Sequence, residues 1–239
     1  MANNLIEKNW IDDFIKTDAF SEALGMVWRN GYETGGYFQF THKSQAIVKK
    51  FADFFGRETR SRYCEDKGYM EWYMSMNSDH SFIRKVKEFG WTPIREKSRL
   101  FPKGEFNKEV FVKNYILLRH ELGTIKVKRP ENKIYVRPRL RIHGSTDILE
   151  HLNNFMFEEL GIKKKKLQTD GKIPKAKILY FQSFKDIESI LKYIGASETL
   201  ETLYSFDLGY HNVEEFNEFP ERILLPQACE GRSPTVGGR

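Results

Sequence analysis

An internal repeat constrains the fold of this chain more than any other feature of its sequence. Three pairs of segments match between the two halves: EALGMV with HELGTI, FTHKSQAIV with RIHGSTDIL, and FIRKVKEFGW with IESILKYIGA. A repeat period of roughly 100 residues is typical of one supersecondary unit used twice. We therefore expect a first repeat over residues 5–90, a linker over 91–109, a second repeat over 110–196, and a C-terminal extension over 197–239 that is acidic and partly flexible.

Hydrophobic periodicity predicts the elements of each repeat. In the second half, helical spacing stops at Gly123, and period-two alternation follows on both sides of a turn. Ser145 or Thr146 is expected to cap the next helix, because short polar side chains accept hydrogen bonds from the first turn. The expected order is helix 114–123, strands 124–128 and 133–143, helix 148–160, a hairpin from 163–166 and 176–183, and helix 185–194.

The first half fits the same template. The predicted elements are a helix over 19–25 that stops at Gly25, strands 26–30 and 37–42, helix 44–55, strands 57–63 and 69–75, and helix 80–89. Both halves then follow the order αββαββα. The predicted fold class is α+β, with helices covering one face of each sheet and the other face exposed.

The exposed strand face of the second repeat is strongly basic. Arg137, Arg139, Arg141 and His143 alternate with apolar residues, and we assign Lys126 and Lys128 to the same face of the preceding strand. Lys164 and Lys166 are expected on the strand that follows. Such a row of cations can contact successive phosphates or purine edges in a major groove, whereas the alternative interpretation is protection of an edge strand by charge.

The first repeat carries fewer cations at the equivalent places. Its candidate contact residues are Gln39 and Thr41 on one strand, with Arg29, Arg60 and Arg62 on its neighbours. Glutamine can read adenine and arginine can read guanine, so this face could still contact bases. Alternatively, this half only supports the other.

Charge and composition exclude several classes of protein. The formal charge is +6, which favours a polyanionic partner such as nucleic acid. No apolar run is long enough to cross a membrane and no secretory signal is visible, so we expect a soluble, intracellular protein. The two cysteines and the histidines form no pattern typical of a disulfide scaffold or a zinc site.

The repeated order of elements resembles the LAGLIDADG homing endonucleases that carry two repeats in a single chain. FQFTHKSQ is similar to the strand-to-helix passage of that family, and WTPIREKSRLFP is similar to its segment between repeats. The resemblance implies a DNA-binding saddle in which the first helices of the two repeats pack side by side. It also implies a metal-binding acid directly before the glycine that ends each of these helices.

In this sequence the acids are missing from the motif as we align it. The residues before Gly25 and Gly123 are Leu24 and Leu122, and leucine cannot coordinate Mg²⁺. Glu22 and Glu121 stand close to the same glycines and are the candidates for displaced catalytic acids, with ordinary surface polarity as the alternative.

The sequence therefore predicts sequence-directed binding of double-stranded DNA by a protein that has lost cleavage. This function needs no metal or cofactor, and the internal repeat predicts a monomer. One alternative is an active endonuclease that uses Mg²⁺ with the displaced glutamates. A second alternative is an RNA-binding intron maturase, because some members of the family assist splicing.

Overall fold

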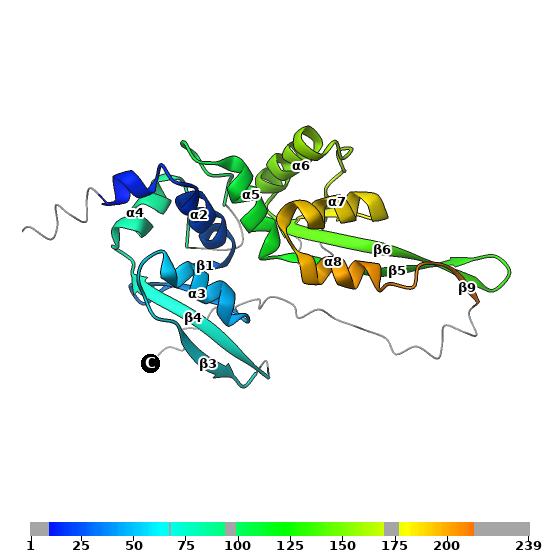
Figure 1. Ribbon diagram of the computed structural model, residues 1–239, viewed down its shortest axis with the longest axis horizontal. Coiled ribbons are helices and arrows are strands. Elements are labelled where there is room, and N and C mark those ends of the chain that lie inside the picture. The colour runs from blue at the N-terminus through cyan, green and yellow to red at the C-terminus, as the bar shows by residue number, and fades with distance from the viewer. Residues whose placement is uncertain (1–9, 67, 94–98, 170–176, 213–239) are drawn as a thin grey trace, which may run out of the picture.

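The computed structural model describes residues 10–66, 68–93, 99–169 and 177–212. Two antiparallel sheets, each with helices on one face, flank a central pair of helices (Figure 1). A single hydrophobic cluster runs through both halves and includes the fully buried Phe20, Phe51, Phe111 and Phe181. The predicted fold class is confirmed, with one sheet in each half of the chain.

The first half has the predicted order of elements. They are helix α2 (Asp18–Asn30), strands β1 (Gly31–Thr34) and β2 (Tyr37–His42), helix α3 (Gln45–Asp53), strands β3 (Arg60–Cys64) and β4 (Tyr69–Asn77), and helix α4 (Ser81–Glu88). The strand order in this sheet is β1-β2-β4-β3. Phe38 and Phe40 on β2 point into the core, so the opposite parity of β2 lies on the open face of the sheet.

The second half repeats this order and adds a helix and a strand. It contains helix α5 (Lys108–Leu117), strands β5 (His120–Arg129) and β6 (Lys133–Gly144), helix α6 (Thr146–Leu160), strands β7 (Gln168–Thr169) and β8 (Lys177–Phe181), helices α7 (Phe184–Ile194) and α8 (Ser197–Tyr204), and strand β9 (Gly209–Asn212). The order is β5-β6-β8-β7, and β9 pairs with β6. The hairpin β5–β6 projects beyond the helices (Figure 1).

The prediction that α2 ends at Gly25 is wrong, and so is the strand predicted over 26–30. The helix continues to Asn30, and Gly25 lies inside it at the contact with α5. A Cβ at position 25 would lie 2.7 Å from the backbone oxygen of Phe111 and 3.2 Å from Cβ of Asn114. The glycine therefore permits a close approach of the two central helices and does not end the helix.

The predicted end of the second central helix is also wrong. Helix α5 stops at Leu117, and the segment from His120 to Gly123 belongs to β5. Gly123 is paired with Arg139, whose guanidinium lies across it, because a Cβ at position 123 would be 3.3 Å from Nη2 of Arg139. Leu122 is buried in the core at 4% exposure.

The predicted linker fastens the two halves together. Arg99 is 5% exposed and donates hydrogen bonds to the backbone oxygens of Trp28 at 2.5 Å and Gly31 at 2.7 Å, which are at the C-terminal end of α2. Its own backbone oxygen accepts from Ser145 at 2.7 Å, at the start of α6. A buried cation at a helix C-terminus satisfies carbonyls that have no partner within the helix.

Part of the predicted C-terminal extension is an ordered addition to the second half. Helix α8 and strand β9 lie within residues 197–212, and the remainder, with its acidic residues, lies outside the described residues. Lys163 to Lys166 do not form the strand that we predicted, because they occupy an irregular segment before β7. Within the described residues, no helix is long and apolar enough to cross a membrane.

Candidate nucleic-acid interface

The open face of the second sheet is built in rows across paired strands. Residues directly opposite each other on antiparallel strands point to the same face, so the register fixes which side chains are neighbours. From the inner end outward, the rows are Glu121 with Arg141 and Tyr180, Gly123 with Arg139, Ile125 with Arg137, Val127 with Tyr135 and Tyr210, and Arg129 with Lys133 and Asn212. We call this surface the arginine face.

The prediction that Arg137, Arg139, Arg141 and His143 share one face of β6 is confirmed by the burial pattern, in which the intervening residues are buried. Successive arginines are about 6.6 Å apart along the strand. The side chains of Arg139 and Arg141 are 25% and 26% exposed, so they are partly held within the surface.

Glu121 is the acid at the inner end of this face. Its carboxylate pairs with Arg141, lies 3.8 Å from Nη2 of Arg139, and lies 3.5 Å from Nε2 of His143. These hydrogen bonds, first from His143 and then from Arg141, outweigh burial and lower the pKa of the Glu121 carboxyl to about 2. One carboxylate thus orients the inner cations and leaves the face with an excess of positive charge.

The prediction that Lys126 and Lys128 share the face of the arginines is wrong. Lys126 pairs with Val136 and Lys128 pairs with Ile134, so both point away from the arginines. Both are exposed because the helices do not extend over the outer part of the hairpin. Lys164 and Lys166 are exposed beside α6, and Nζ of Lys164 lies 5.2 Å from the ring centre of Phe157.

The open face of the first sheet is a hydrogen-bonded network. Arg62 donates from Nε to Glu71 at 2.8 Å and from Nη2 to the hydroxyl of Tyr32 at 3.2 Å. Tyr32 donates to the side-chain oxygen of Gln39. Glu71 is 5% exposed, so Arg62 neutralises a buried carboxylate. The pKa of Arg62 is raised by its hydrogen bonds to Tyr32 and Glu71, which outweigh burial.

The other candidates of the first repeat are not equivalent. Arg60 lies on the same face, opposite Tyr73, and is exposed. Thr41 shares the parity of this face and is buried at 6% exposure. Arg29 is not on a strand: it lies in α2 at 9% exposure, and its Nη1 donates to the hydroxyl of Tyr115 at 3.3 Å.

The residues at the ends of the central helices do not fit a Mg²⁺ site. The glycine that follows α2 is Gly31, and the residue before it is Asn30, whose amide donates to the backbone oxygen of Thr41 at 3.0 Å. Arg119 and His120 follow the C-cap of α5. Magnesium prefers carboxylate oxygens, and these positions offer an amide and basic groups.

The two glutamates proposed as displaced acids are engaged elsewhere. Glu22 pairs with Lys50 of α3, and Glu121 lies within the arginine face. His120 is partly buried, its Nε2 forms a hydrogen bond of 3.0 Å with the hydroxyl of Thr199 in α8, and burial lowers its pKa. Among the described residues, no group of three or more acidic, histidine or cysteine side chains could hold a metal ion.

Sequence reasoning missed several residues that shape these faces. Glu71 and Tyr32 hold Arg62, and Tyr210 extends the arginine face from a strand that was not predicted. The turn that joins β3 to β4, together with the alternation of apolar residues around Glu71, is the signal that could have predicted Glu71 opposite Arg62. No local signal marks β9, because four residues are too few to show a period.

No protein-family model and no curated protein matches the sequence. Solved structures do match the fold. The meganuclease I-SmaMI, bound to its uncleaved DNA target with calcium ions, is 12% identical, with 77% of this chain and 89% of that chain covered and a TM-score of 0.50. The LAGLIDADG meganuclease I-AabMI bound to uncleaved DNA is 12% identical over 79% of this chain and 88% of that chain, with a TM-score of 0.48.

The N-terminal LAGLIDADG domain of DUF199/WhiA also matches, at 16% identity over 77% of this chain and 86% of that chain, with a TM-score of 0.46. The protein thus has the LAGLIDADG meganuclease fold, with two antiparallel sheets and helices in two repeats. The fold resemblance inferred from the order of the elements is confirmed.

Proposed function

We propose that this protein binds double-stranded DNA at a preferred sequence and does not cleave it. The observation that carries the proposal is the arginine face, where Arg137, Arg139 and Arg141 lie along one side of a strand that projects beyond the helices. A ribbon of antiparallel strands fits the major groove, and arginine is the side chain best suited to guanine edges and phosphates.

The fold supports the same partner. I-SmaMI has this fold and is bound to a DNA target in its structure. In this protein the two sheets come from one chain and are joined by the contact between α2 and α5, so a monomer supplies both halves of the interface.

The absence of cleavage rests on the chemistry of the helix ends. A two-metal mechanism needs oxygen ligands of high negative charge to hold the ions between attacking and leaving groups. Neither Asn30 nor Arg119 provides a carboxylate at the end of its helix, and Glu121, which follows α5 in the sequence, is neutralised by Arg141. The protein accordingly acts by occupying its site.

The test begins with selection of a preferred duplex from a randomised library by the full chain. The selected duplex is then incubated with the protein, with and without Mg²⁺ or Mn²⁺, and binding and strand nicking are measured in one gel. We expect a shift that does not depend on metal and no nicking. Cleavage that depends on metal would contradict the proposal, and so would tighter binding to structured RNA than to any duplex.

A further inference from the structure

Near the outer end of the arginine face, one row inside Arg129 and Lys133, lies an exposed aromatic and aliphatic platform. Tyr135 of β6 lies directly between Val127 of β5 and Tyr210 of β9, and all three point to the same face as Arg137. The ring centres of Tyr135 and Tyr210 are 4.6 Å apart, and the guanidinium carbon of Arg137 lies 5.0 Å from the ring centre of Tyr135. Tyr210 is 68% exposed.

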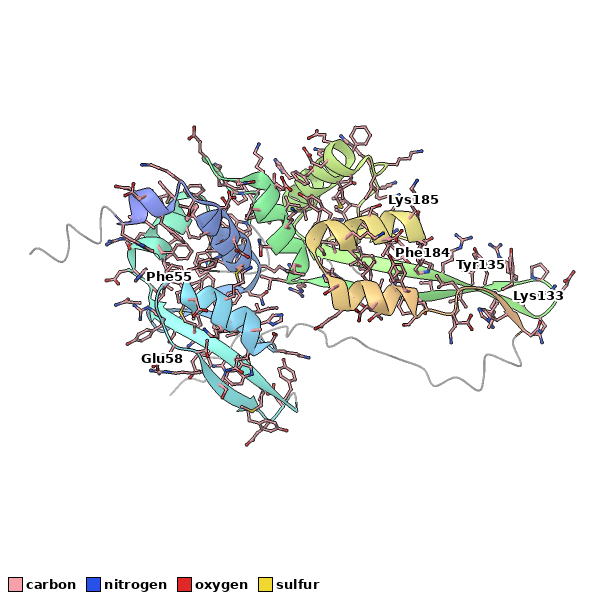
Figure 2. All side chains as sticks on the ribbon, in the orientation of Figure 1. Phe55, Glu58, Lys133, Tyr135, Phe184 and Lys185 are labelled. Carbon is pink, nitrogen blue, oxygen red and sulfur yellow. The ribbon has the colours of Figure 1, made fainter. Side chains whose placement is uncertain are left out.

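This platform is positioned by a strand outside the two repeats. Strand β9 pairs with the outer part of β6, from Lys133 to Val136, whereas β8 pairs with the inner part, from Leu140 to Gly144. Tyr135 lies on the section of the hairpin beyond α7 and α8 (Figure 2). The platform lies on the open face of the sheet, and β9 widens the sheet at the place where it is farthest from the central helices.

We propose that Tyr210, Tyr135 and Val127 contact base pairs near the outer end of one half of the DNA site and select thymine there. This inference rests on the proposed function. Apolar side chains in the major groove recognise thymine through its methyl group, and the platform presents ring edges and a branched aliphatic group between the row of Arg137 and the row of Arg129 and Lys133. The inner rows carry arginines, which suit guanine and phosphate.

Strand geometry gives the position of this contact. Six residues separate Arg141 from Tyr135, which corresponds to about 20 Å along the strand. The rise of duplex DNA is about 3.4 Å per base pair, so the thymine contact lies about six base pairs farther from the centre of the site than the contact of Arg141. The inner end of β6 is at the central helices, since a Cβ at Gly144 would lie 3.0 Å from the hydroxyl of Tyr115.

The first sheet carries no matching addition among the residues that the structure describes, because β1 and β3 form its edges. The preference for thymine should therefore occur at one end of the site only. This asymmetry separates the proposal from a general contribution of aromatic residues to affinity.

The experiment compares binding of the full chain to the selected duplex and to a copy in which thymines at the outer positions are replaced by deoxyuridine. This replacement removes only the methyl group. We expect wild-type affinity to fall about threefold to fivefold at one end, as one methyl contact is lost, and to stay unchanged at the other end. Tyr210→Thr, which keeps a residue suited to a strand, should bind both duplexes equally.

Tyr63→Thr is the matched control, because Tyr63 is 60% exposed on a strand and, by its pairing with Met70, lies on the opposite parity from Arg62. It should retain the full difference between thymine and deoxyuridine. If wild-type protein binds a preferred duplex but does not distinguish the two bases, this inference is overturned and the proposed function stands. If wild-type protein binds no duplex, the proposed function itself fails. Tyr135→Thr provides a second variant should Tyr210→Thr release β9.

Discussion

The two sheets have the same strand order and carry their charge in different ways. On the first sheet, Arg62 is tied to the buried Glu71 and to Tyr32, so its charge is neutralised inside the protein. On the second sheet, Glu121 is shared by Arg139, Arg141 and His143, and Arg137 packs against the ring of Tyr135. One scaffold thus supports a network that stabilises the fold and a surface suited to a polyanion.

This difference indicates a division of labour within the proposed interface. A cation that neutralises a buried acid contributes to folding, and its removal leaves that acid without a partner. A cation held at the surface beside others contributes to attraction for phosphates. The predictions below test whether the arginines of the two sheets separate in this way.

The largest expected effect is on DNA affinity. Arg139→Glu should weaken binding to the selected duplex about a hundredfold, which is about 2.8 kcal/mol, and lower the dependence of binding on salt by roughly one unit. Lys126→Glu is the matched control, because Lys126 is on the same hairpin and points to the other face. Titration of the duplex at several salt concentrations measures the affinity and its salt dependence for each variant. Equal losses in the two variants would remove the distinction between the faces.

A smaller effect on folding is expected in the first sheet. Arg62→Met removes the partner of Glu71, which is 5% exposed, and should lower the free energy of unfolding by about 2 kcal/mol. Arg60→Met, at an exposed position on the same strand, should change it by less than about 0.5 kcal/mol. Denaturant unfolding of the two variants gives the comparison, and similar midpoints would show that Arg62 does not stabilise the fold.

The sequence predicts the order of elements well because periodicity is a local property. Strand Tyr37–His42 and the cap at Ser145, whose hydroxyl accepts from the backbone of Ile148 at 3.3 Å, are found where the pattern places them. Ends of helices depend on tertiary contacts. Gly25 has the signature of a helix end, yet it lies inside α2, where it permits the close approach of Phe111.

The faces of β6 could be predicted from alternation, but those of β5 could not. The turn between the strands decides which residues of β5 lie on the same face as Arg139. In this turn Glu131 and Asn132 both have positive φ, and Arg129 is paired with Lys133. This register pairs Lys126 with Val136, so the lysines point away from the arginines. Contacts between distant segments, such as Arg99 with the end of α2, have no local pattern.

The junction of the two halves should be sensitive to a single methyl group. Gly25→Ala places a Cβ 2.7 Å from the backbone oxygen of Phe111, so α2 and α5 must move apart, at a cost of about 1.5 kcal/mol. Asn114→Ala removes atoms from the same contact and should lower the melting temperature less. Thermal unfolding of both variants decides this, and a melting temperature for Gly25→Ala at or above that of Asn114→Ala would contradict the close packing.

The smallest effect concerns Glu121 and its dependence on pH. The pKa of this carboxyl is about 2 in the folded protein, against an ordinary value of 4.5. The charged form is therefore stabilised by folding, and this contribution is present above pH 4.5 and is lost as the pH falls toward 2. Because the carboxylate is partly exposed, solvent limits the contribution to about 1 kcal/mol.

Glu121→Gln should consequently be less stable than the wild type by about this amount at pH 7, and the two should converge as the pH falls from 4.5 toward 2. The same variant removes the negative charge beside Arg139 and Arg141 and should bind DNA more tightly at pH 7. Unfolding curves at several pH values and one binding titration separate these effects. The carboxylate orients the arginines, which favours binding, and repels phosphates, which opposes it. Weaker binding by Glu121→Gln would mean that the first effect is larger than the second.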